Sequence, residues 1–303
     1  MRKLSLFAAI VLVVALVFVS CATTGGTTST AAPVSEPVST LDLSGYSYTV
    51  DASGYPVSSD GYRYADYIPA PTATREERAD LSDEDWVNFR LVSTTGMGTQ
   101  LYRSSSPINP YLGRTAETDA MFSKYGIKTA LNFGNSEEKA KSYAAYAGSY
   151  YSTINVVYLP GKWMSDYTTF NVWYPSKDSE TIKQNLATAF RAIIESEGPI
   201  VIHCTWGKDR TGISVAILEA LMGASWDEIR ADYVKSYYNF FGVDPDSEEG
   251  QKISKYQIEL QLKVIFEEND LSTADLAQCA KDYIISLGLT EAEVEALKTK
   301  LGQ

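Results

Sequence analysis

Hydrophobic and polar positions follow two different periods from about residue 80 onward. Residues 100–106, 128–133 and 153–159 are short apolar or alternating runs, which are typical of β-strands. Apolar residues three or four positions apart predict helices between Thr118 and Tyr125 and between Ser179 and Ser196. Strands that alternate with helices indicate an α/β fold, in which a central, mainly parallel sheet is flanked by helices.

One further strand leads directly into the most charged part of the sequence. Residues 200–202 form a short apolar run that ends at His203 and Cys204. Helical spacing resumes over residues 211–222, and residues 225–228 form a capping box that starts the next helix. Ligands of such folds bind beyond the carboxyl ends of the strands, so the segment after this strand is where we expect a site.

The first 20 residues have the composition of a signal peptide. Arg2 and Lys3 precede an apolar run that ends at Val19 and is short for a membrane span. The segment resembles a bacterial lipoprotein signal, in which a small residue precedes the Cys that carries the lipid, here Cys21. This resemblance implies an exported protein that is lipid-anchored to a bacterial membrane, periplasmic or at the cell surface. Plain secretion and an uncleaved anchor stay open as alternatives.

Two segments separate the signal from the alternating region. Residues 21–45 are rich in Thr, Ser, Gly and Pro without any period, which predicts a flexible tether. Residues 46–79 contain many tyrosines, which we interpret as an extended arm that lies on the following domain. A ligand-stacking surface is the alternative for this arm. Residues 80–303 are long enough for one sizeable α/β domain and carry the candidate chemistry.

The overall charge limits the possible ligands. The 303 residues contain 26 Lys and Arg against 38 Asp and Glu, a net charge of −12. This excess repels phosphate backbones, which excludes nucleic acid as a partner, so any phosphate ligand must be attracted locally. Apart from Cys21 the chain has only Cys204 and Cys279, too few for a disulfide framework. Cys279 falls in an apolar helical stripe and is interpreted as a core residue.

The stretch VIHCTWGKDRTG, residues 201–212, has the features of an anion site. The five residues between Cys204 and Arg210 can turn their backbone N–H groups toward one centre, where the following helix adds partial positive charge. Gly207 permits the tight turn, and the planar guanidinium of Arg210 can bind two phosphate oxygens. The same field favours the thiolate of Cys204. The predicted phosphate-binding residues are Thr205, Trp206, Gly207, Lys208, Asp209 and Arg210.

A thiolate at the bottom of an anion site predicts the hydrolysis of phosphomonoesters. Cys204 is placed to attack phosphorus in line, giving a phosphocysteine that water then cleaves. His203 is expected to orient the loop through its ring nitrogens and to support the thiolate, with simple packing as the alternative. Thr211 is expected either to donate its hydroxyl to the leaving sulfur or to serve only as a helix-start hydroxyl.

These residues resemble the signature of the Cys-based protein tyrosine phosphatase superfamily, H-C-x5-R-[S/T], and in detail the HC-x-x-GKDRTG of its bacterial tyrosine phosphatase family. The similarity continues upstream in LYRSSSP (101–107) and GIKTALNFGNSEE (126–138). It implies that Cys204 is the nucleophile, that Arg210 binds phosphate, and that no metal or other cofactor is needed. Relatives often carry Asp-Leu-Arg where this chain has Asn-Phe-Gly at 132–134, so an acid usually near the pocket is absent.

The acid that protonates the leaving group has three candidates. Asp209 lies inside the loop, and the equivalent residue has this role in phosphatases of the myotubularin type, which the loop resembles. A structural Asp209, paired with Lys208 or tying down the loop, is the alternative. Asp166 follows Trp163 in the interval where the superfamily usually carries a mobile acid loop. Asp178 is the third candidate, although its position favours a helix start.

Two side chains of the loop favour different classes of substrate. Lys208 adds a cation, which favours substrates with several phosphates, such as phosphoinositides and inositol phosphates. Trp206 can stack on an aromatic or inositol ring, or pack against a helix. The resemblance favours a protein tyrosine or dual-specificity phosphatase acting on a phosphorylated protein. A non-catalytic lipoprotein that binds phosphate, and adhesion through the Tyr-rich arm, are the alternatives from other function classes.

Overall fold

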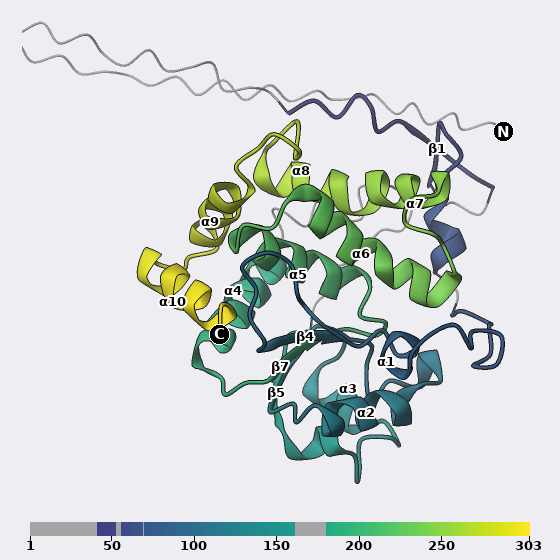
Figure 1. Cartoon of the computed structure of the whole chain (residues 1–303), viewed down its shortest axis with the longest axis vertical. Helices are drawn as coiled ribbons and strands as arrows, with labels where there is room; N and C mark the ends of the chain where they lie inside the picture. The colour runs from purple at the N-terminus through teal and green to yellow at the C-terminus, as the bar shows by residue number, and fades with distance from the viewer. Residues whose placement is uncertain (1–40, 53–55, 69, 161–179) are drawn as a thin grey trace, which may run out of the picture. The chain divides into compact units, whose positions relative to one another are not determined.

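The central sheet is built from the apolar runs that the sequence predicts as strands. The structure, a computed structural model, describes residues 41–52, 56–68, 70–160 and 180–303 (Figure 1). Within these ranges five strands pair in the order β3-β4-β7-β5-β6. Four of them run parallel, and β3 is antiparallel to β4, so the prediction of a mainly parallel sheet is confirmed. The strands are β3 (Arg90–Leu91), β4 (Leu101–Ser104), β5 (Thr129–Asn132), β6 (Asn155–Tyr158) and β7 (Ile200–His203).

Helices lie on both sides of this sheet, as Figure 1 shows for α2 and α3 on one side and α5 and α6 on the other. The predicted helices near Thr118, after Ser179 and from residue 211 appear as α2, α4 and α5. The α-helices of the described residues are α1 (Asp83–Trp86), α2 (Thr115–Lys124), α3 (Glu137–Lys141), α4 (Glu180–Glu195), α5 (Asp209–Leu221), α6 (Trp226–Phe241), α7 (Glu248–Ile253), α8 (Leu260–Phe266), α9 (Leu276–Ser286) and α10 (Glu291–Leu301). A π-helical segment, Ser254–Glu259, joins α7 to α8.

Successive side chains of the strands belong to two different hydrophobic cores, one on each face of the sheet. Ala130 and Val201 pack with residues of α1, α2 and α3, whereas Leu131, Ile200 and Ile202 pack with residues of α4, α5 and the helices beyond. This division follows from the strand geometry, in which successive side chains point to opposite faces. A strand buried on both faces reads as a continuous apolar run, which is why residues 200–202 contain no polar position.

The three central strands end at one edge of the sheet. In the register of β7 with its two neighbours, His203 lies opposite Ser104 of β4 and Asn132 of β5. The loop that starts at Cys204 therefore leaves the middle of the sheet and enters α5 at Asp209. Almost every residue of α5 is buried, so this helix is a core element and holds the end of the loop firmly.

The Tyr-rich segment differs from the extended arm that we expected. It forms a short hairpin of β1 (Tyr48–Val50) and β2 (Pro56–Ser58), followed by the 3-10 helix η1 (Tyr64–Tyr67). Tyr62 stacks on Tyr256 with ring centroids 5.3 Å apart, and Tyr67 meets Phe241 edge-on at 5.1 Å. Tyrosine rings bury a large apolar area, which makes this segment part of the main core rather than a surface arm.

The predicted signal peptide, Cys21 and the larger part of the tether lie outside the described residues. Among the residues that are described, no helix combines the length and the apolar character needed to cross a membrane.

Candidate functional site

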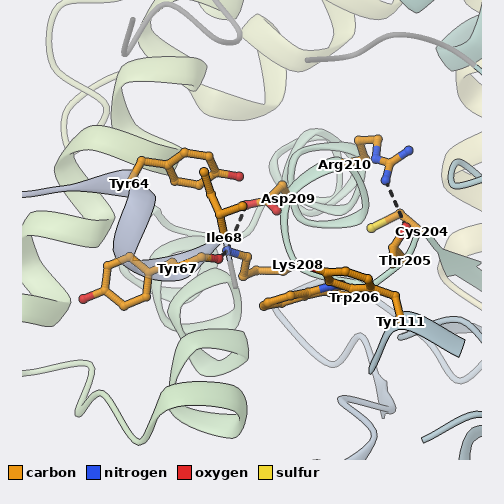
Figure 2. A pocket seen from close by; sticks show the side chains of 10 residues that line it. All are labelled: Tyr64, Tyr67, Ile68, Tyr111, Cys204, Thr205, Trp206, Lys208, Asp209 and Arg210. Carbon is orange, nitrogen blue, oxygen red and sulfur yellow. Dashed lines mark hydrogen bonds and ion pairs between the residues drawn. The ribbon is translucent and has the colours of Figure 1, made fainter. Parts of the chain in front are cut away.

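A cavity of about 190 Å³ opens where β7 meets α5, and the loop 204–208 forms its floor. Figure 2 shows the loop residues on one side of the cavity and residues of the N-terminal segment on the other. The structure thus brings the predicted loop residues together around one space. The residues that line the cavity are Tyr64, Tyr67, Ile68, Tyr111, Cys204, Thr205, Trp206, Lys208, Asp209 and Arg210.

The first two carbonyl groups of the loop are bonded away from the cavity. His203 donates from Nδ1 to the carbonyl oxygen of Cys204 at 3.2 Å. The backbone N–H of Ser106, just beyond β4, donates to the carbonyl oxygen of Thr205 at 3.1 Å.

The next two carbonyl groups are bonded in the same outward direction. Asn88 donates from Nδ2 to the carbonyl oxygens of Trp206 (3.1 Å) and Gly207 (3.2 Å), and Arg103 donates from Nη2 to Gly207 (2.9 Å). The C=O and N–H groups of a trans peptide point in opposite directions. Four outward carbonyls in succession therefore leave the amide hydrogens that follow them, at residues 205 to 208, to face the cavity.

Asn88 and Arg103 are themselves fixed by a buried polar network. Arg90 and Arg103 both pair with Asp232 of α6, the first at 2.7 Å. Arg90 also donates from Nη1 to Oδ1 of Asn88 at 2.7 Å, and the Ser236 hydroxyl accepts from Asn88. Buried charges persist only when they are paired and hydrogen-bonded, so this network holds the rear of the loop in one arrangement.

Gly207 is the residue that allows the loop to lie against β4. Its φ is +68°, in the left-handed region, and a Cβ added there would meet the carbonyl oxygen of Ser104 at 2.0 Å. An L-residue with a side chain would therefore suffer both backbone strain and a collision. Glycine at 207 is required by this close approach.

Cys204 is buried, yet its thiol is made more acidic. Burial raises the pKa of the thiol, but the positive charge of Arg210 and hydrogen bonding from the side chain and backbone N–H of Thr211 outweigh it. The negative charge of Asp209 also raises the pKa, but the net pKa of Cys204 lies below its ordinary value of 9.0. Within the described residues no nitrogen or oxygen pairs with Oγ1 of Thr211 in good geometry, so this hydroxyl is available to the sulfur.

His203 is a neutral side chain that links Tyr151 to the carbonyl of Cys204 through hydrogen bonds. Burial lowers the pKa of its ring to about 4. The hydrogen bond to the carbonyl of Cys204 raises this pKa, and the positive charge of Arg210 lowers it further. Its Nε2 lies 3.1 Å from the hydroxyl of Tyr151, which itself accepts from Nδ2 of Asn132 at 3.0 Å. With Asn132 donating, Tyr151 donates to Nε2 and the ring proton resides on Nδ1. His203 therefore orients the loop without adding positive charge.

Arg210 lies beside the sulfur and is partly engaged by the protein. Its Nη1 donates to the carbonyl oxygen of Phe133 at 2.6 Å, and its Nη2 donates to Oγ1 of Thr205 at 3.3 Å (Figure 2). A guanidinium has five N–H donors, so these bonds fix its plane and leave others for an oxyanion. The turn that supplies the Phe133 carbonyl comes close to the loop, since a Cβ at Gly134 would meet Cys204 and Thr205 backbone atoms at 3.2 and 3.3 Å.

Lys208 and Asp209 pair with each other at 3.6 Å across the cavity wall. The ammonium group of Lys208 is only 1% exposed and donates to the carbonyl oxygen of Tyr67 at 3.0 Å. Burial lowers the pKa of Lys208, and the carboxylate of Asp209 opposes that shift. The cation that we expected to favour substrates with several phosphates is directed into the N-terminal segment, and the alternative in which Asp209 pairs with Lys208 matches this arrangement. In the described residues, Oδ1 of Asp209 has no hydrogen-bond partner.

Trp206 is packed rather than exposed at the rim. Its ring lies 5.5 Å from that of Phe240 and 5.9 Å from that of Phe241, both on α6. The exposed neighbour is Tyr111, whose ring is tilted by 30° to that of Trp206 at 6.1 Å. The open edge of the cavity is thus aromatic.

Two of the three acid candidates cannot be placed. Asp166 and Asp178 both lie outside the described residues, as does Trp163. Asp209 is placed, and it lines the cavity.

Several residues of the site could not be identified from the pattern of the sequence. Asn88 and Arg103 act on the loop across more than 100 positions, and the tyrosines of η1 reach it from even farther. The one local signal was Arg103, a charged residue inside a strand of the central sheet, because a buried charge implies a specific partner.

Comparison with known proteins gives a consistent result. A profile described as "Tyrosine phosphatase family" matches residues 97–303. A tyrosine-protein phosphatase of Nostoc commune is 26% identical over 212 residues, covering 63% of this chain and 72% of the relative. A putative tyrosine-protein phosphatase of Cupriavidus necator is 27% identical over 192 residues, covering 55% and 67%. Among solved structures, the core catalytic domain of the PP-IP phosphatase SIW14 of S. cerevisiae is similar, with 20% identity, coverage of 55% and 91%, and a TM-score of 0.32.

Proposed function

The chain belongs to the tyrosine phosphatase family, and on this premise we propose that it hydrolyses phosphotyrosine in proteins through a phosphocysteine at Cys204. The enzyme is a Cys-based phosphatase. The observation that carries the proposal is the position of Cys204 beside Arg210 at the floor of a cavity with aromatic walls, where the charge of Arg210 helps to lower the pKa of the thiol.

In the proposed first step the Cys204 thiolate attacks phosphorus in line, and the bond to the tyrosyl oxygen breaks. The inward amide hydrogens of the loop and the guanidinium of Arg210 bind the three equatorial oxygens, whose charge they stabilise in the transition state. The tyrosyl oxygen leaves with a proton from an acid. Water then attacks the phosphocysteine, the bond from phosphorus to sulfur breaks, and the hydroxyl of Thr211 donates to the departing thiolate.

We propose Asp209 as that acid. It lines the cavity, and its charge is the smallest of the causes that act on the pKa of Cys204. The same carboxylate can take the proton of the attacking water in the second step, which returns the site to its starting state.

Leaving groups of different basicity test this role. We expect Asp209→Asn to slow phosphotyrosine hydrolysis by about 10²- to 10⁴-fold, because tyrosine is a poor leaving group without a proton. Turnover of p-nitrophenyl phosphate, which needs little protonation, should change far less. If Asp166→Asn shows this pattern and Asp209→Asn does not, the acid is Asp166.

Aromatic walls support an aryl substrate over a phosphoinositide. Tyr64, Tyr67, Tyr111 and Trp206 surround the cavity, and aromatic rings gain affinity from offset or edge-on contacts. Lys208, the cation that suggested substrates with several phosphates, donates instead to the carbonyl oxygen of Tyr67. The names of the two bacterial relatives agree with this choice.

A panel of substrates tests the proposal. We expect release of phosphate from phosphotyrosine peptides, less from phosphoserine and phosphothreonine peptides, and none from any of them with Cys204→Ser. Preferred release from phosphoinositides or inositol phosphates would instead favour that alternative. Absence of turnover in reducing buffer would favour a non-catalytic phosphate-binding protein.

We also propose that Cys21 is lipidated after export and holds the enzyme at a membrane. Membrane fractionation tests this, because Cys21→Ser is expected to move the protein to the soluble fraction.

A further inference from the structure

The ammonium group of Lys208 is enclosed by aromatic rings. Its Nζ lies 4.5 Å from the ring centroid of Tyr237, 5.3 Å from those of Tyr64 and Trp206, and 5.7 Å from that of Phe241. Ring faces attract cations most strongly when water is excluded, as it is around this 1% exposed side chain. The enclosure and the bond to the Tyr67 carbonyl hold the charge away from the open part of the cavity.

One of the four rings, Tyr64, and the carbonyl of Tyr67 come from a segment outside the part of the chain that matches the family, and this segment forms one wall of the cavity. The other three rings lie within the match. Tyr64, Tyr67 and Ile68 line the cavity, whereas the family match begins at residue 97. Figure 2 shows the ring of Tyr64 turned toward the loop residues, whereas the ring of Tyr67 points away from them and its backbone lies beside Lys208.

This wall is anchored to the helices beyond the loop. The hydroxyl of Tyr67 donates to Glu249 of α7, and its ring meets that of Tyr237 on α6 edge-on at 5.2 Å. Contacts with two helices make the wall a fixed part of the site.

We propose that the segment Tyr62–Ile68 is a specificity wall, which withdraws Lys208 from the substrate and so restricts the cavity to a single phosphate on an aromatic ring. The inference rests on the proposed function and adds the element that sets its substrate class. The cavity has three charged lining residues, Lys208, Asp209 and Arg210. With Lys208 enclosed, Arg210 binds the phosphate to be cleaved, and the described residues that line the cavity offer no other cation to a second phosphate.

Removal of one ring face tests the wall. Tyr64→Leu keeps an apolar side chain in the core but deletes the one of the four π faces over Lys208 that the wall supplies, and it opens the cavity on that side. The measurement is the ratio of kcat/KM for a phosphotyrosine peptide to that for inositol tetrakisphosphate. We expect this ratio to fall by about tenfold in Tyr64→Leu, because the released ammonium can bind a second phosphate. Adding Lys208→Met to Tyr64→Leu should restore the wild-type ratio.

Tyr46→Leu is the matched control. Tyr46 lies in the same N-terminal segment, and its ring faces the ammonium of Lys263 at 5.4 Å, but it does not line the cavity. This variant is expected to keep the wild-type ratio.

The outcomes separate the wall from the proposed function. A wild-type enzyme that cleaves inositol tetrakisphosphate but no phosphotyrosine peptide overturns the proposed function. An active tyrosine phosphatase whose ratio is unchanged in Tyr64→Leu, or whose double variant keeps the shift, overturns the wall alone. If Tyr64→Leu does not fold, Lys208→Met decides: an enclosed Lys208 predicts a ratio within about twofold of wild type, and a rise of about tenfold overturns the wall.

Discussion

Cys204 and Cys279 are the free cysteines of the described residues, and their surroundings act in opposite directions. Cys204 is the more deeply buried, yet Arg210 and Thr211 lower the pKa of its thiol against the effect of burial. Cys279 is half-buried on α9, where burial, and then the charge of Glu268, raise its pKa to about 11. Burial penalises both thiolates, so the charges and donors around each sulfur decide which one is reactive.

The largest difference between the two cysteines is expected in catalysis. Cys204→Ser should reduce turnover of p-nitrophenyl phosphate by at least about 10³-fold, because a hydroxyl is a far weaker nucleophile here. Cys279→Ser should keep wild-type turnover. Equal losses in the two variants, measured on folded protein, would remove the basis of the comparison.

The pH dependence of alkylation measures the same contrast without substrate. The alkylation rate follows the thiolate fraction, which rises with pH up to the pKa of each thiol. At pH 7 a thiol of pKa 9.0 is about 1% ionised and one of pKa 11 about 0.01%. Because the pKa of Cys204 lies below 9.0 and that of Cys279 near 11, the thiolate fraction of Cys204 is at least about 100 times larger. A less basic thiolate is the weaker nucleophile, so iodoacetamide should modify Cys204 at least about tenfold faster. Mass spectrometry of the two peptides over pH 6 to 11 reports both rates, and the Cys204 rate should level off at the lower pH.

Asn88→Gly tests whether the outward carbonyl bonds acidify Cys204. Glycine accepts the φ of +55° at this position, so the change removes the amide donors while keeping the backbone conformation. Without these donors the peptides of the loop can turn, and their amide hydrogens then stabilise the thiolate of Cys204 less. Alkylation of Cys204 at pH 7 should therefore slow by about tenfold, while alkylation of Cys279 stays constant.

A stability-matched control accompanies this variant. Thr290 caps α10, and Thr290→Ala removes that cap at a cost of about 1 kcal/mol. It should leave the alkylation of Cys204 unchanged. An Asn88→Gly enzyme with wild-type alkylation would show that the loop holds its shape without the amide.

The smallest effect is expected at the other cysteine. Glu268→Gln removes the charge nearest to the sulfur of Cys279 but not the effect of burial, which is the larger cause. Alkylation of Cys279 at pH 8 should therefore rise by severalfold, to a rate that is still below that of Cys204. The same experiment on Cys204 serves as the internal control.

The loop was predictable from the sequence because its chemistry is local. A strand, a Cys, a left-handed Gly and an Arg follow one another within 11 residues, and each acts on its neighbours in the chain. The strands of the parallel sheet were predictable for a similar reason, since burial on both faces leaves uninterrupted apolar runs.

The walls of the site were not predictable, because they depend on contacts between distant segments. The spacing of the tyrosines in residues 46–79 fits neither a helix nor a strand, and only the packing against α6 reveals that Tyr67 is part of the core. Lys208 was interpreted as a free cation because a sequence shows the charge of a side chain but not its direction. Asn88 is a single polar residue between Val87 and Phe89, and no neighbouring residue indicates that its backbone is left-handed.

The central position of β7 has a consequence for how the enzyme loses activity. Its residues pair with β4 on one side and with β5 on the other over the whole strand. Backbone amides held in this way exchange with deuterium only when the sheet as a whole opens. The catalytic loop starts from this strand, so on heating, activity and the slowest-exchanging amides should disappear together.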